Sequence, residues 1–95
     1  MDSADRDRKK AWKEREREKA RSAFPLSEVQ LNSMFNTVEA QVEEGGCDHS
    51  HRFTKQWLSE NQEPVDKVID WLEEHGGYCD CEVLANAYDH WMQNK

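Results

Sequence analysis

The chain has 95 residues, 35% of them charged, and a formal net charge of −7. This length allows one domain with a small core, and a core of that size commonly needs a staple such as a metal ion. No apolar run is long enough to span a bilayer, and no apolar signal segment follows the charged start. We therefore expect no membrane partner. Three cysteines cannot all pair in internal disulfides, so we expect a protein of the reducing cytoplasm.

The charge is divided unevenly along the chain. Residues 1–22 hold nine Lys and Arg against six Asp and Glu, whereas residues 23–95 hold four against fourteen. The acidic body repels the phosphates of nucleic acids, so any such contact would have to come from the N-terminal part. We therefore expect the partner to be a protein.

The basic N-terminal part has the composition of an exposed helix. It is rich in helix formers from Lys9 to Ala20 and has few apolar residues, chief among them Trp12. We predict a charged helical arm over residues 1–23, ahead of a helical metal-binding domain over residues 24–95. The arm is interpreted as a solvated helix, with a partner-binding helix anchored by Trp12 as the alternative.

The first core helix is predicted over residues 26–44. Ser27 and Gln30 have the spacing of a capping box, and Leu26 and Leu31 have that of a hydrophobic staple. Apolar residues then repeat on one face, at Leu31, Met34, Phe35, Val38 and Val42. The helix should end at the glycine pair 45–46.

Two shorter helices are predicted over residues 52–61 and 64–75. The segment from Asn61 to Pro64 separates them. Each carries an apolar stripe at helical spacing, formed by Phe53, Trp57 and Leu58 in the first helix and by Val65, Val68, Ile69 and Leu72 in the second. Pro64 is suited to the first turn of the second of these helices. Two antiparallel helices of about equal length return the chain close to its starting point.

The last helix is predicted over residues 81–92. Its core face is expected to be formed by Leu84, Ala87, Tyr88 and Trp91. With the segments before it, this helix gives an all-α fold, a domain of about four helices preceded by the charged N-terminal helix.

Two Gly-Gly pairs each run almost directly into a ligand-Asp-ligand triplet, within residues 45–49 and 76–81. Glycine can adopt the left-handed conformation that ends a helix, so each pair should stop one helix. Asp48 and Asp80 are then expected to be N-caps of the next helix, with His49 and Cys81 in its first turn. Each triplet would thus lie at a loop-to-helix corner.

The triplets contain all three cysteines of the chain and one histidine. Three thiolates and one imidazole are a donor set that tetrahedral structural zinc sites use. The helices between the two triplets would bring the donors together. The sequence therefore predicts one zinc ion per chain, bound by Cys47, His49, Cys79 and Cys81.

Two runs are specific enough to compare with known families: Gly-Cys-Asp-His at 46–49 and His-Gly-Gly-Tyr-Cys-Asp-Cys-Glu-Val-Leu-Ala-Asn at 75–86. With Arg52 and Thr54 between them, they resemble a family of small bacterial proteins known only as domain of unknown function 2695. The resemblance implies a bacterial origin and a shared site at Cys47, His49, Cys79 and Cys81. It implies no activity.

Two other histidines leave the fourth ligand open. Cys47 to His51 is similar to the Cys-Asp-Gly-Ser-His run of small iron–sulfur proteins, which hold a [2Fe–2S] cluster with three Cys and one His. A [2Fe–2S] cluster and a metal-free redox pair of Cys79 and Cys81 are therefore alternatives to zinc. His75 lies at the end of a predicted helix, where it suits a favourable C-terminal charge or a hydrogen-bond donor to a ligand.

A closed site of four Cys and His ligands leaves no open position for a substrate. The sequence also lacks the zinc deaminase pattern, a His-Glu-x-x-His helix, a phosphate-binding glycine loop and a Gly-x-Ser-x-Gly elbow. We therefore do not expect an enzyme. The sequence favours a zinc-stapled helical module that binds another protein, with a redox or metal-responsive thiol protein as the alternative.

Overall fold

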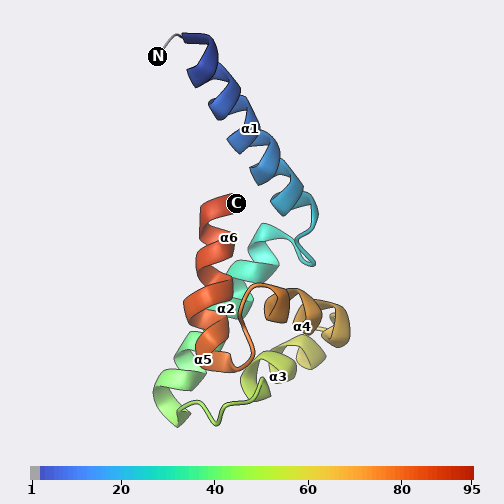
Figure 1. Ribbon diagram of the computed structural model, residues 1–95. Coiled ribbons are helices and arrows are strands. Elements are labelled where there is room, and N and C mark those ends of the chain that lie inside the picture. Colours follow the sequence, from blue (N-terminus) through green and yellow to red (C-terminus); the bar gives the residue numbers. More distant parts are fainter. Residues whose placement is uncertain (1–2) are drawn as a thin grey trace.

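The computed structural model describes the backbone of residues 3–95 and the side chains of residues 11–95; residues 1 and 2 of the predicted arm lie outside the described part. All regular elements in that part are helical, which confirms the predicted all-α class. The elements are α1 (Ser3–Ser22), α2 (Glu28–Gly45), α3 (Arg52–Glu60), α4 (Val65–Glu74), α5 (Asp80–Glu82), the π-helix η1 (Val83–Ala87) and α6 (Tyr88–Asn94). The last three follow one another without a break and form one long helix (Figure 1).

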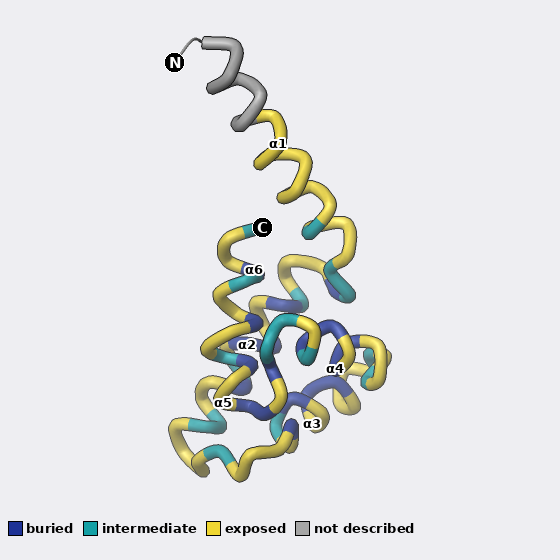
Figure 2. The backbone as a smooth tube through the Cα atoms, viewed as in Figure 1, coloured by how far each residue is buried: buried dark blue, intermediate teal, exposed yellow. Residues whose placement is uncertain are grey.

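The core lies where α2, α3, α4 and the last helix meet (Figures 1 and 2). The apolar stripes predicted for the first three of these helices supply most of it. Trp71 was not on a predicted stripe, yet it is only 6% exposed. The buried apolar side chains are Leu26, Leu31, Met34, Phe35, Val38, Trp57, Leu58, Val68, Ile69, Trp71, Leu72, Val83, Ala87 and Trp91.

The start of α2 confirms the predicted capping box. The Gln30 N–H donates to Ser27 Oγ at 3.1 Å, and the Ser27 N–H donates to Gln30 Oε1 at 2.9 Å. Leu26 and Leu31, the predicted staple pair, are both buried. The helix begins at Glu28 because Ser27 is its N-cap, so Leu26 contributes to the core from outside the helix.

The last helix differs from the predicted pattern because it contains a π turn. The Tyr88 N–H donates to the Val83 carbonyl, five residues earlier, and this widened turn shifts which side chains face the core. Val83 and Ala87 are therefore fully buried, whereas Leu84 is half-buried and Tyr88 is 36% exposed. Tyr88 lies at the rim of the core, where its ring packs against Phe35 and Trp91 with centroids 5.3 and 5.8 Å apart.

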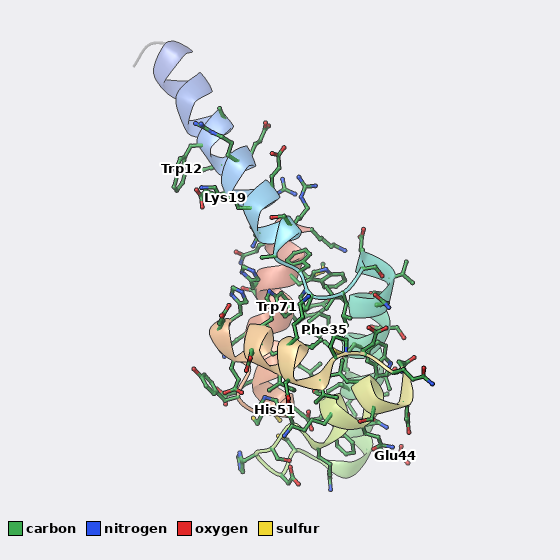
Figure 3. The ribbon with its side chains drawn as sticks, turned by 90° about the vertical axis from the view of Figure 1, so that its right-hand side faces the viewer. Trp12, Lys19, Phe35, Glu44, His51 and Trp71 are labelled. Atoms are coloured by element: carbon green, nitrogen blue, oxygen red, sulfur yellow. The ribbon has the colours of Figure 1, made fainter. Side chains whose placement is uncertain are left out.

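Helix α1 projects from the body and is exposed along its described side chains (Figures 1 and 2). Its packing is against α6, and Arg17 Nη2 donates to the Lys95 carbonyl at 3.0 Å. Trp12 is 59% exposed and points away from the helix (Figure 3). The charged helix expected around residues 9–20 is thus present, and it extends over Ser3–Ser22, whereas the domain boundary at residue 23 stays a prediction. None of the described helices, α1 included, combines the length and the apolar composition that crossing a membrane requires.

The glycine pairs end helices as the sequence predicts. Gly46 has a φ of 76° and follows α2, and Gly76 has a φ of 83° shortly after α4. A Cβ at position 76 would lie 3.1 Å from Asn86 Cβ and Nδ2, whereas a Cβ at position 46 would meet nothing within 4 Å. The Asn86 side chain also donates to the Gly76 carbonyl at 3.0 Å. The turn at Gly76 is therefore both left-handed and closely packed.

The two left-handed glycines make a matched pair of substitutions. Gly46→Ala should cost about 1–3 kcal/mol of unfolding free energy, because its backbone, with φ 76° and ψ 162°, lies in a region that only glycine readily adopts. Gly76→Ala should cost more, because its methyl group also displaces Asn86 from the turn. Urea unfolding of both variants measures the difference. Equal losses would mean that the Asn86 side chain moves aside for the added methyl group without a measurable loss of stability.

Candidate metal centre

The first corner, residues 46–51, joins α2 to α3. The Cys47 sulfur accepts a hydrogen bond from the His49 N–H at 3.4 Å, and Asp48 Oδ1 accepts one from the Ser50 N–H at 3.1 Å. Asp48 therefore closes a local turn instead of capping a helix, because α3 begins only at Arg52. The predicted roles of Asp48 as N-cap and of His49 in the first helical turn were wrong.

The second corner, residues 75–81, runs from the end of α4 into the first turn of α5. Cys79 stands at the N-cap position of α5 and makes no side-chain cap, while its sulfur lies 3.6 Å from Glu82 Oε1. Cys81 lies within α5, as predicted for the second triplet. Asp80, predicted as the N-cap of this helix, is instead its first residue and is fully buried.

The buried Asp80 carboxylate caps α3, across the fold. It accepts hydrogen bonds from the N–H of Phe53 at 3.0 Å, the N–H of Thr54 at 3.2 Å and Thr54 Oγ1 at 2.7 Å. Asp80 thus supplies the acceptor that α3 lacks locally, since His51 makes no cap at the N-cap position. Asp80 was predicted to cap the helix that follows it, and this was wrong, because its carboxylate caps α3 through Thr54, 26 residues earlier in the sequence. The sequence contains no local signal for this contact.

The two corners are in direct contact. The Asp80 N–H donates to the Ser50 carbonyl at 2.9 Å, and the Cys81 N–H lies 3.4 Å from the Cys47 sulfur. His51 Nε2 lies 2.7 Å from the Gly77 carbonyl oxygen. The expectation that the helices between the triplets would return the chain to its starting point is confirmed by these contacts.

The three cysteines gather at this junction and influence each other's ionisation. Burial acts to raise the pKa of the Cys47 thiol, but hydrogen bonds from the N–H groups of Cys81 and His49 and from the thiols of Cys81 and Cys79 outweigh it and lower that pKa. Burial, with the nearby Cys47 sulfur, raises the pKa of Cys79. The hydrogen bond to Cys47, loss of hydration and neighbouring negative charge raise the pKa of Cys81 to about 11. Cys47 is therefore the first of the three to become a thiolate.

The histidines are placed differently from one another. His49 is exposed, has a φ of 66°, and contacts Cys47 through its backbone N–H. His51 is buried at the junction, where Figure 3 labels it at the lower end of the molecule. His75 lies at the end of α4, as predicted, and its ring stacks on His90 with 3.6 Å between centroids. Among the described residues, no three His, Cys, Asp or Glu side chains are arranged so that they could hold a metal ion as they stand.

The fold and the junction define a small all-helical protein with three thiols at two loop-to-helix corners. Residues 34–86 match the family described as "Protein of unknown function (DUF2695)". The chain is also similar to "Uncharacterized protein Rv2271" of Mycobacterium tuberculosis and "Uncharacterized protein Mb2294" of Mycobacterium bovis, at 30% identity over 81% of this chain and 78% of each relative. No solved structure matches it. The chain belongs to the DUF2695 family, and its bacterial relatives confirm the resemblance noted in the sequence.

Proposed function

We propose that this chain is a zinc-binding helical module in which zinc has a structural role. The ligands would be the thiolates of Cys47, Cys79 and Cys81 with one histidine, for which the sequence predicts His49. The observation that carries the proposal is that cysteines from both corners lie together: the Cys81 N–H is 3.4 Å from the Cys47 sulfur, although the two residues are 34 positions apart. Cysteines brought together from two corners, in a core this small, match the usual construction of structural zinc sites.

The surroundings of Cys47 are those of a metal-binding cysteine and not those of an unreactive core cysteine. Its sulfur accepts N–H groups from both corners, and such hydrogen bonds favour the thiolate, which is the form that binds zinc. Zinc–sulfur bonds of about 2.3 Å would hold the sulfurs about 3.8 Å apart in a tetrahedral site. The donors are not arranged in that way at present, so zinc binding would require the side chains at the junction to close around the ion.

The proposed biological role is interaction with another protein. Trp12 is 59% exposed on a helix that projects from the body, and large aromatic residues are the side chains that most often anchor protein interfaces. The acidic body, with fourteen carboxylates against four basic residues in 23–95, disfavours nucleic acid. Zinc thiolates survive in a reducing compartment, so the proposal includes a cytoplasmic location.

Metal analysis tests the proposal directly. Protein purified under reducing conditions should contain about one zinc per chain and be colourless, since zinc has no visible absorbance from its filled d shell. Element analysis and the visible spectrum are the measurements. A matched Cys47→Ser, Cys81→Ser variant should contain little zinc. Iron with sulfide would point to the [2Fe–2S] alternative, and a metal-free chain whose thiols oxidise readily would point to the redox alternative.

A further inference from the structure

His51 has a more constrained environment than the other histidines near the thiols. It is 9% exposed, stands immediately before α3, and its Nε2 lies 2.7 Å from the Gly77 carbonyl oxygen. A carbonyl oxygen only accepts, so Nε2 carries the proton of this hydrogen bond. In the neutral imidazole the lone pair is then at Nδ1.

This hydrogen bond has the form that proteins use to orient a metal-binding imidazole. A ligating histidine almost always donates its second ring N–H to a carboxylate, a backbone carbonyl or water, which fixes the tautomer and the ring. The acceptor here, Gly77, lies two residues before Cys79. The carbonyl of Ser50, the residue before His51, accepts a hydrogen bond from the N–H of Asp80, and Asp80 stands between Cys79 and Cys81 in the sequence. The ring is thus fixed at the junction that gathers the thiols.

His49 lacks these features. Its side chain is exposed, and its contact with Cys47 uses the backbone N–H. Its φ of 66° belongs to the left-handed region, which turns the chain between Cys47 and Ser50. An exposed ring would have to be ordered when metal binds, whereas the ring of His51 is already held.

We propose that His51, through Nδ1, is the fourth ligand of the zinc site, in place of the His49 that the sequence predicts. The inference rests on the proposed zinc-binding function. The site would then be Cys-x-x-x-His from the first corner and Cys-x-Cys from the second. The Gly77 carbonyl becomes the group that orients the histidine, so the second glycine pair contributes to the site through its backbone.

Cadmium NMR on the unaltered chain tests the assignment without substitution. In protein labelled with ¹⁵N and loaded with ¹¹³Cd, scalar coupling should appear at Nδ1 of His51, with its proton on Nε2, and none should appear at His49. Coupling at His49 would overturn the inference and leave the zinc-binding function intact. Failure of the wild-type chain to bind cadmium or zinc would overturn both.

Ligand swaps followed with cobalt provide the second test. The wild-type chain loaded with Co(II) should give the spectrum of three thiolates and one imidazole. His51→Cys should convert it to a four-thiolate spectrum, with charge-transfer absorption rising in the ratio of four thiolates to three. The matched control, His49→Cys, should leave the spectrum unchanged. The opposite pattern would assign the fourth position to His49.

Discussion

Chelation of zinc under reducing conditions is expected to lower the thermal midpoint strongly and to broaden the amide NMR signals of residues 26–92. Structural zinc has an apparent binding free energy of about 10–16 kcal/mol near neutral pH, which is comparable to the whole stability of a small domain. The proposed ligands lie at the corners where α3 and α5 begin, so a bound zinc ion would fix how these helices start relative to each other. Helix α1 projects from the body and packs against α6, away from the proposed site, so it should respond little.

A cysteine variant separates loss of metal from a side effect of the chelator. Cys81 is exposed, so Cys81→Ser removes a proposed ligand with little change in packing. This variant should melt like the chelated wild type, and chelator should not lower its midpoint further. A sharp spectrum and an unchanged melting curve after zinc removal would contradict a structural role. The metal-responsive alternative would then be preferred.

Replacement of Asp80 by Ala is expected to be the most damaging single change outside the apolar core and the ligands. It leaves the N–H groups of Phe53 and Thr54 and the Thr54 hydroxyl without their acceptor. A donor left without a partner costs about 1–3 kcal/mol, and three donors are affected, so the free energy of unfolding should fall by at least about 3 kcal/mol. Urea denaturation measures it.

Asp48→Ala is the matched control, because Asp48 occupies the same central position in the first triplet. Its carboxylate is exposed and accepts hydrogen bonds from Ser50 within its own turn. The bond from the Ser50 hydroxyl, aided by the one from the Ser50 N–H, lowers the pKa of Asp48. The control should change stability far less than Asp80→Ala. Similar losses for the two variants would mean that the triplets are equivalent and that the cross-fold cap of α3 contributes little.

Much of the fold could be predicted because its signals are local. The capping box at Ser27 and the apolar spacing of α2 depend on residues three or four apart. The glycine pairs and the Asn61–Pro64 break mark helix ends through backbone conformation alone. The helices over residues 28–45, 52–60 and 65–74 accordingly lie within two residues of the predicted bounds.

The wrong predictions concern contacts between residues far apart in the sequence, which the spacing of neighbouring residues cannot indicate. Asp80 was assigned to its own helix by a capping rule, whereas the packed structure turns its carboxylate toward α3. The π turn from Val83 to Ala87 changed the core face of the last helix, and an α-helical period cannot anticipate it. The choice between His49 and His51 has the same origin, because the repeat of the triplets favoured His49 and only the tertiary contact with Gly77 distinguishes His51.

The cap from Asp80 to α3 has a consequence for how this sequence can vary. Thr54 donates twice to the Asp80 carboxylate, and the two residues are 26 positions apart. Without a carboxylate at position 80 the buried Thr54 hydroxyl loses its acceptor, whereas without a hydroxyl at position 54 the Asp80 carboxylate keeps its two backbone N–H donors. Among relatives, a hydroxyl at position 54 should therefore occur together with an acceptor side chain at position 80, whatever residues flank position 80.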